Sequence, residues 1–267
     1  MVEQLFKILD SYVNSSPSDE SAINLFQGEW SSSLPGLPPA ICGSSPLFDD
    51  SRIHSWIARI HAAIPSSISE PHLFKVLELG PLEGGHTYML SNQGWDIQAI
   101  ESNCRAFLKC LISANIYGTK ARFMLGSFEE YFSGLAPEVM FDFVCCSGVL
   151  YHLKKPTESF RQILQHTKSI GIWSHYGSPE LLANMPERFS LDSYYDSVSA
   201  TASTGYKQFY GSALNLPSFC GGGQDHSLWM SRQQIKDILA EYGFNIEVIN
   251  DRTDPAGPHI TLFAYKS

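Results

Sequence analysis

The sequence lacks dense clusters of basic residues. Its 18 Lys and Arg residues stand against 27 Asp and Glu residues, which gives a formal net charge of −9. Phosphate backbones and anionic lipid surfaces repel a chain of this charge on average. We therefore expect neither a nucleic acid partner nor a membrane partner.

Two further features are missing. No two of the six cysteines form a C-x-x-C pair, so the spacing typical of zinc sites is absent and we expect no metal. No apolar run approaches the roughly 18 residues that a membrane helix needs, and no basic-then-apolar leader opens the chain. These absences predict reduced cysteines and a cytoplasmic protein.

The N-terminal part of the sequence predicts helices and a loop. Apolar residues among the first twelve favour a short amphipathic helix, and residues 31–46 are rich in Ser and Pro, as loops are. A stripe at helical spacing predicts a helix that ends before Pro65, and its members are Ile53, Trp56, Ile57 and Ile60. We expect residues 1–70 to form a helical and loop cap, with Trp56 packed in the core.

Strand-like and helix-like segments alternate from residue 74 onward. The strand-like runs are 74–79, 96–100, 121–125, 141–146 and 169–174. Asn103 and Thr157 each precede an apolar helical pattern, and both residue types are good N-caps. This alternation predicts βαβ units and a parallel sheet with right-handed crossovers.

Residues 175–230 interrupt the alternation. The stretch is rich in Tyr, Ser, Gly and Phe, shows no clear period and is too long for a plain connection, so we expect a functional insertion or lid. Ser231 and Gln234 then form a capping-box pattern, and Gly243 marks the end of that helix. Two strand-like runs joined by a Pro- and Gly-rich turn predict an antiparallel pair at 244–250 and 259–265.

The stretch FKVLELGPLEGGHT, residues 74–87, begins like a buried strand and ends like the start of a helix. Gly80 ends the strand, while Gly84 and Gly85 permit the close approach of a ligand or of the helix to the sheet. Glu101 ends the next strand about 20 residues later, where an acid accepts hydrogen bonds from ribose hydroxyls. Taken alone, each feature also fits an ordinary turn or a solvated carboxylate. Together they predict a nucleoside-type cofactor.

A dinucleotide fits this turn poorly. Leu82 occupies the middle glycine position of G-x-G-x-x-G, which leaves less room for a pyrophosphate, and Glu83 would repel one. Glu78 adds another acid just before the turn. An acidic pocket favours a cofactor that carries positive charge, which argues against a nicotinamide-dependent oxidoreductase.

These residues resemble a known family. Residues 76–84 and Glu101 resemble the first two motifs of class I S-adenosylmethionine-dependent methyltransferases, and residues 125–131 and 141–153 resemble the third and fourth. The resemblance implies an α/β fold with a Rossmann-like doubly wound sheet. That sheet would be mostly parallel with an antiparallel C-terminal strand, an N-terminal helical cap and an inserted lid, in a methyltransferase domain spanning residues 71–267.

The resemblance implies S-adenosylmethionine as the cofactor and S-adenosylhomocysteine as the product. Glu78 is a further acid at this site, and Ser127 stands where many members of the family have an acid. The implied contacts are Gly80, Glu83, Gly84 and His86 for the methionine part, Glu101 and Ser102 for the ribose, Ser127 and Phe128 for the adenine, and the backbone of Cys146 and Ser147 for the amino group.

Methyl transfer from a sulfonium is an in-line displacement, which depends mainly on positioning and needs a base only where the acceptor must lose a proton. Candidate catalytic residues follow the fourth and fifth strands, where ligands of open parallel sheets bind. They are His152, His175 and Tyr176, each of which also fits a local structural hydrogen bond. Asp225 and His226, after three glycines, are a further pair to consider on the insertion.

The insertion offers many aromatic residues and few charges, which favours a small, fairly apolar or aromatic acceptor methylated on oxygen or nitrogen, as in natural-product biosynthesis. Among these aromatics are Tyr194, Tyr195, Tyr206, Phe209, Tyr210, Phe219 and Trp229. Two alternatives remain. Residues 148–153, with Pro156, also resemble a loop of enzymes that modify the wobble uridine of transfer RNA, and the same fold serves non-catalytic nucleoside-binding modules. We expect a monomer or a homodimer.

Overall fold

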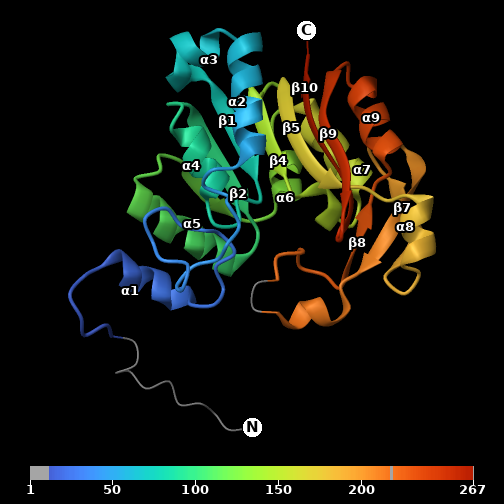
Figure 1. Ribbon diagram of the computed structural model, residues 1–267. Coiled ribbons are helices and arrows are strands. Elements are labelled where there is room, and N and C mark those ends of the chain that lie inside the picture. The colour runs from blue at the N-terminus through green and yellow to red at the C-terminus, as the bar shows by residue number, and fades with distance from the viewer. Residues whose placement is uncertain (1–11, 217–218, 267) are drawn as a thin grey trace.

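The computed structural model describes residues 12–216 and 219–266, so the helix expected among the first twelve residues falls almost entirely outside it (Figure 1). A seven-stranded sheet of order β3-β2-β1-β4-β5-β10-β9 occupies the centre. The first five of these strands run parallel, and β10 is antiparallel to both of its neighbours. This arrangement confirms the predicted Rossmann-like fold class. The strands are β1 (Lys75–Leu79), β2 (Asp96–Glu101), β3 (Arg122–Leu125), β4 (Phe143–Ser147), β5 (Ser169–His175), β9 (Asn245–Asp254) and β10 (Gly257–Tyr265).

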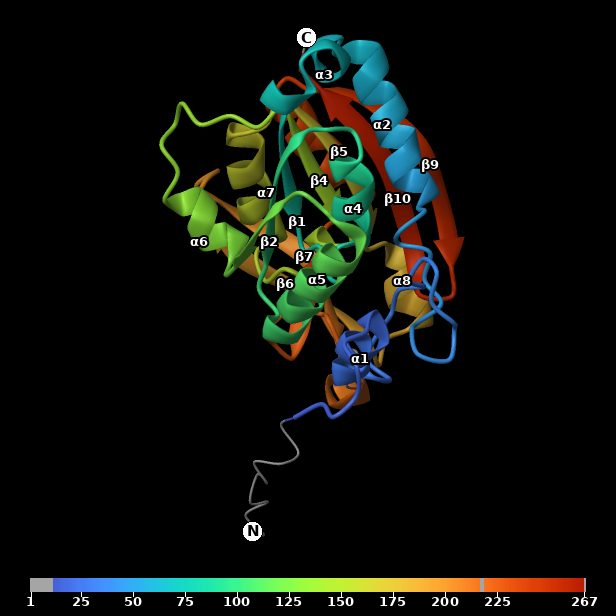
Figure 2. The same ribbon diagram turned by 90° about the vertical axis from the view of Figure 1, so that its left-hand side faces the viewer.

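Helices cover both faces of the sheet. Figure 2 shows α2 (Ser51–Ala63) and α4 (Gly85–Ser91) on one side, and α6 (Phe128–Ser133) and α7 (Pro156–Gln165) on the other. The remaining α-helices of the described residues are α1 (Asp19–Ile23), α3 (Ser66–Ser69), α5 (Cys104–Tyr117), α8 (Pro179–Asn184) and α9 (Arg232–Glu241). None of the helices in the described part of the chain has the length and apolar character needed to cross a membrane.

The central strands are buried on both faces, which explains their continuous apolar sequence. Cys145 packs in the core beneath α2, together with Trp56 and Phe143, whereas Cys146 packs in the core on the α7 side. Trp56 is fully buried, as predicted, and lies against Gly171 of β5. A Cβ at Gly171 would lie 2.4 Å from the indole, so only glycine lets α2 pack this closely on the sheet.

Helix starts test the predicted caps. Asn103 caps α5, since its side chain accepts from two backbone N–H groups, and the capping box at the start of α9 is present. The predicted cap at Thr157 is wrong, because α7 begins one residue earlier, at Pro156, with Lys155 at the N-cap position. Proline is well suited to the first helical position, where no N–H is needed.

The insertion contains a separate antiparallel sheet of order β6-β7-β8, made of β6 (Phe189–Asp196), β7 (Thr201–Phe209) and β8 (His226–Trp229). The sequence showed no strand period here because β6 places Leu191 and Tyr195 outside and Asp196 inside. Arg161 of α7 pairs with the buried Asp196 at 2.7 Å, and Thr157 bonds both Asp196 and Tyr194. The insertion is therefore fastened to α7 through β6.

The N-terminal segment and the insertion lie at the same end of the molecule, at the carboxyl ends of the parallel strands (Figure 1). Residues 12–50 form a small apolar cluster that packs on α4 and α5, and its buried members are Ile23, Phe26, Trp30, Leu34 and Phe48. In contrast, α2 belongs to the core of the main sheet. The division of the chain at residue 70 stays a prediction.

Candidate active site

The glycine turn after β1 follows a left-handed path. Gly80, Leu82 and Gly84 have φ angles of 60°, 56° and 78°. Leu82 therefore adopts the conformation expected of the missing middle glycine, at a cost of roughly 1–2 kcal/mol for a residue with a Cβ. Its backbone N–H donates to Glu101 Oε2 at 3.0 Å, which helps to hold it there.

Glu101 joins the two motifs that the sequence singled out. Its carboxylate accepts from the backbone N–H of Asn103 at 2.8 Å and from that of Leu82 at 3.0 Å, and the residue is 7% exposed. Burial raises the pKa of Glu101, and these backbone hydrogen bonds oppose the rise. A carboxylate has about four acceptor sites, so ribose hydroxyls still have partners here.

Glu83 lies in the turn but its carboxylate does not face an open site. The side chain is fully buried, and Lys109 Nζ lies 2.6 Å from Oε1. The backbone N–H groups of Ser31 and Ser32 donate to the same carboxylate at 2.9 and 2.7 Å. The expectation that Glu83 presents a free negative charge is therefore wrong, because its charge is balanced and used to hold the N-terminal segment.

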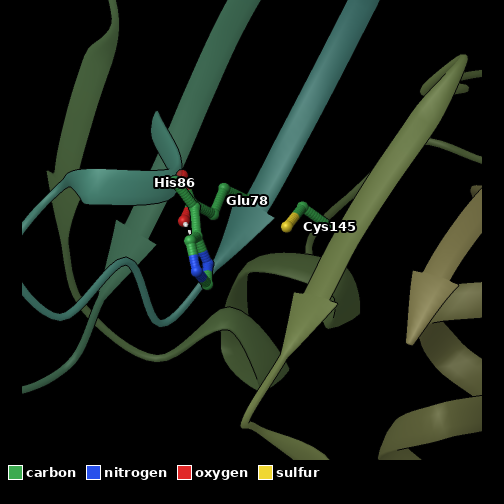
Figure 3. A group of neighbouring side chains, drawn as sticks. All are labelled: Glu78, His86 and Cys145. Atoms are coloured by element: carbon green, nitrogen blue, oxygen red, sulfur yellow. Dashed lines mark ion pairs between the residues drawn. The ribbon is translucent and has the colours of Figure 1, made fainter. Parts of the chain in front are cut away.

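Glu78 is buried beside His86 and Cys145 (Figure 3). Thr87 donates to its carboxyl group, and burial raises the pKa of Glu78 to about 8, so this acid is protonated at neutral pH. His86 Nε2 lies 3.0 Å from Asp50 Oδ2, and burial lowers the pKa of His86. Of the three acids expected at this site, Glu78 holds a proton and Glu83 is paired. Glu101 is therefore the one that can carry an uncompensated negative charge.

The carboxyl end of β4 supplies the third part of the site. The Ser147 hydroxyl is buried and has no hydrogen-bond partner among the described residues. A buried polar atom without a partner is costly, so a ligand group that bonds to it is a natural complement. Cys146 is fully buried in the core, where burial raises its pKa to about 12, which leaves only its backbone for binding.

The predicted adenine and ribose contacts lie on neighbouring loops. Ser127 is the N-cap of α6 and accepts from the Glu130 N–H, so its hydroxyl has a structural partner. Phe128 is half-buried against the main core, and Ser102 is exposed beside Glu101. These positions stay predicted contacts of the cofactor.

A second group of side chains gathers at the ends of β4 and β5, and we call it the aromatic cluster. Its members are Tyr151, His152, His175, Tyr210 and Trp229. His152 Nδ1 lies 3.0 Å from the Tyr210 hydroxyl, and burial lowers the pKa of His152 to about 4. Tyr151 lies between the two histidines, with ring centroids 4.1 Å from His152 and 4.9 Å from His175. His175 stacks on Trp229 at 5.0 Å.

The other catalytic candidates lie outside this cluster. The Tyr176 hydroxyl donates to Asp251 at 2.8 Å, and burial together with this acid raises the pKa of Tyr176 to about 12. His226 Nδ1 and Asp225 Oδ1 lie in hydrogen-bond contact at 2.6 Å on the insertion. Sequence reasoning passed over Lys109 and Asp50, although the place of Asp50 just before a helical stripe was a usable cap signal.

Comparisons with known proteins agree with this arrangement. Residues 47–248 match a family model described as a methyltransferase domain, and the match covers more than half of the chain. The chain therefore belongs to this family. No curated protein sequence matches it.

Several solved structures share the fold. The N-terminal domain of EvdMO1, solved with S-adenosylhomocysteine and D-fucose, is 20% identical over 93% of this chain and 95% of that one, with a TM-score of 0.67. Magnesium protoporphyrin IX methyltransferase (ChlM) from Synechocystis PCC 6803, solved with S-adenosylhomocysteine, is 14% identical over 80% of this chain and 82% of that one, with a TM-score of 0.53. The kinase-methyltransferase WbdD is 13% identical over 92% of this chain and 46% of that one, with a TM-score of 0.55.

Family, fold and motifs together define a class I S-adenosylmethionine-dependent methyltransferase, as the sequence predicted. S-adenosylhomocysteine, the product of the predicted cofactor S-adenosylmethionine, is bound in the EvdMO1 and ChlM structures. The residues present fit that cofactor, because Glu101 retains acceptor sites and the turn after β1 follows a glycine-like path. The Ser147 hydroxyl also lacks a partner within the described part of the chain. When bound, the cofactor supplies an activated methyl group on a positively charged sulfur.

Proposed function

We propose that this chain methylates an oxygen or nitrogen atom of a small molecule held against the aromatic cluster. The observation that carries the proposal is the placement of His152, a half-buried and neutral imidazole among aromatic rings that follows β4. Pockets with aromatic walls and a few polar groups are typical of small-molecule sites. The same end of the sheet carries Glu101 and Ser147, so acceptor and cofactor meet there.

His152 is suited to receive a proton late in the reaction. When its Nδ1–H donates to the Tyr210 oxygen, Nε2 carries the lone pair that faces a proton donor. A pKa of about 4 makes the imidazole a weak base toward a neutral hydroxyl. The attacked oxygen becomes positively charged as its bond to the methyl group forms, and its proton then moves readily to His152.

The acceptor class rests on the chemistry of the cluster and on the neighbouring structures. Tyr151 and Tyr210 are partly exposed rings, the fully buried Trp229 packs behind them, and the two histidines offer polar atoms. D-fucose in the EvdMO1 structure and the porphyrin substrate named for ChlM are both small ring-bearing molecules. These observations support a ring-bearing metabolite, as in natural-product biosynthesis. A cytoplasmic location and a monomeric or homodimeric state are further parts of the proposal.

Transfer RNA is the second acceptor to consider, because residues 148–153 resemble a loop of wobble-uridine enzymes. A net charge of −9 opposes it, since RNA-binding proteins usually present a basic surface. A non-catalytic nucleoside-binding module would share the cofactor contacts but would leave the aromatic cluster without a chemical use.

The test is methyl transfer from S-adenosylmethionine labelled in its methyl group. Purified protein is incubated separately with fractionated small-molecule extracts and with bulk transfer RNA, and the His226→Ala variant serves as a surface control. We expect label in a small-molecule fraction. Label in transfer RNA would reverse the choice of acceptor, and S-adenosylhomocysteine binding without label in either pool would favour the inert module.

A further inference from the structure

Three side chains that the proposed reaction leaves largely unused converge beside the aromatic cluster. His175 ends β5, His259 lies opposite it in the register of β10, and Asp254 ends β9. One potential ligand atom from each lies within 4.8 Å of the others. We propose that His175, His259 and Asp254 form a binding site for a divalent transition-metal ion.

The spacing of the best-defined pair suits a tetrahedral ion. His259 Nδ1 lies 3.3 Å from Asp254 Oδ2, yet this nitrogen makes no hydrogen bond among the described residues. Bonds of about 2.0–2.1 Å from zinc to nitrogen and oxygen give a ligand-to-ligand separation of about 3.3 Å in a tetrahedron. When Nδ1 carries its lone pair, this nitrogen and the carboxylate oxygen are spaced to share an ion.

The other contacts of these residues leave one ligand atom free on each. A carbonyl oxygen only accepts, so the 3.2 Å contact of His175 Nδ1 with the Pro258 carbonyl places a proton on Nδ1 and a lone pair on Nε2. Such second-atom hydrogen bonds are typical of metal-binding histidines. Asp254 Oδ1 accepts from the backbone N–H groups of Ala256 and Gly257, which leaves Oδ2 for the ion.

The local chemistry sets which ion fits. Two imidazoles and one carboxylate suit zinc, iron or manganese better than magnesium or calcium, which prefer oxygen ligands. Three protein ligands leave a position open, as in catalytic rather than structural sites. Asp254 supplies the negative charge, while Arg188, which acts electrostatically on His175, opposes a cation. Asp254 and Pro258 also line a cavity of about 560 Å³.

The buried group of Glu78, His86 and Cys145 is the competing site (Figure 3). Its chemistry is less suitable, because Glu78 holds a proton at neutral pH and accepts from Thr87, while His86 Nε2 already faces Asp50. Burial also holds the pKa of the Cys145 thiol well above its usual range, which disfavours the thiolate that binds metals.

An ion at the proposed site would face the aromatic cluster, and a hydroxyl of the acceptor would bind at its open position and lose its proton more easily. This consequence rests on the proposed function. Metal binding itself does not, because it is measured without cofactor or acceptor.

The experiment is a calorimetric titration of the chelator-treated full chain with Zn²⁺, followed by absorption spectroscopy with Co²⁺. We expect one equivalent of Zn²⁺ and the visible bands of four-coordinate Co²⁺. His259→Gln and Asp254→Asn should each weaken Zn²⁺ binding by at least about a hundredfold, since even second-shell changes cost 10–100-fold. Both replacements are close in size to the originals, and circular dichroism checks that each variant is folded.

Cys145→Ser and His226→Ala are the matched controls, from the competing site and from the surface of the insertion, and both should bind Zn²⁺ as the wild type does. The proposal is overturned if the wild type takes up no Zn²⁺, if His259→Gln binds normally, or if Cys145→Ser is the variant that loses the ion. Measuring S-adenosylhomocysteine binding on the same samples separates failure of this site from failure of the methyltransferase assignment.

Discussion

The predicted cofactor site around the glycine turn and Glu101, here called the cofactor edge, is built differently from the aromatic cluster. At the cofactor edge, residues from two successive motifs hold each other through the backbone, as when Glu101 accepts from the Leu82 N–H. In the aromatic cluster, side chains from segments far apart in sequence meet directly, as when His152 contacts Tyr210 and His175 stacks on Trp229. The contacts of the cofactor edge join motifs that are close in sequence. Those of the aromatic cluster depend on how the insertion is anchored.

This difference implies different sensitivities to mutation. At the cofactor edge, one carboxylate often serves both the fold and the ligand, so substitutions should affect stability and cofactor binding together. In the aromatic cluster, single side chains should be removable with loss of rate alone. The following four changes test this contrast.

The largest effect is expected at Glu83. Lys109→Met leaves the buried Glu83 carboxylate without its ion-pair partner, and breaking a buried pair costs about 3–5 kcal/mol of unfolding free energy. Urea unfolding followed by circular dichroism measures it. Lys168→Met, which removes an exposed partner of Asp142, is the control and should cost less than about 1 kcal/mol. Equal losses of unfolding free energy in the two variants would mean that the ion pair of Lys109 with Glu83 does not stabilise the fold.

The next effect is expected in the aromatic cluster. His152→Ala should lower the rate of methyl transfer roughly a hundredfold, since general bases contribute at least that much. Its affinity for S-adenosylhomocysteine and its unfolding free energy should stay close to those of the wild type, whereas loss of affinity would place His152 at the cofactor instead. Steady-state kinetics and calorimetry separate the two, and His226→Ala is the control.

A smaller effect is expected at Glu101. Glu101→Gln keeps the shape of the side chain but weakens hydrogen bonds to the cofactor, which should cost about 1–3 kcal/mol of binding free energy for S-adenosylhomocysteine. Calorimetry on the wild type and on Glu247→Gln, a surface carboxylate paired with Arg59, supplies the comparison. Unchanged affinity in Glu101→Gln would remove Glu101 from the site.

The smallest effect, measured per pH unit, is the pH dependence that Glu78 gives to the free energy of unfolding. Its pKa of about 8 in the folded protein lies above the ordinary value of 4.5, so its contribution to stability is complete below about pH 4.5 and is lost as the pH rises toward 8. The slope contributed by one such group is at most about 1.4 kcal/mol per pH unit. Urea unfolding between pH 5 and 8.5 should show a flatter profile in Glu78→Gln, and an unchanged slope would mean that Glu78 is ionised in the folded state.

The sequence brought the glycine turn and Glu101 together correctly, because the signals for them are local. Gly80, Gly84 and Glu101 lie within about 20 residues, and the strand rhythm placed them at one end of the sheet. The predicted negative charge of the pocket is smaller than the sequence indicates. Lys109 neutralises Glu83, and burial raises the pKa of Glu78 so that it holds a proton. Both effects depend on tertiary contacts that no spacing reveals.

The insertion was much harder to predict. β6 turns Leu191 and Tyr195 outward and buries Asp196, which reverses the usual pattern of apolar and polar faces. The site at its base combines His152 with residues more than twenty positions away, and chain order carries no signal of such meetings. His259, within a buried C-terminal strand, likewise had no motif to mark it.

The anchoring of β6 limits how the insertion is able to open. Arg161 and Thr157 bond Asp196 at the end of β6 and so hold this end of the insertion on α7. A rigid-body rotation of the three-stranded sheet would have to break both contacts. At its near end, Tyr210 and Gln224 touch His152 through single hydrogen bonds. Substrate entry would then require breaking the hydrogen bonds of Tyr210 and Gln224 to His152. The shape of these two side chains would set which molecules are admitted.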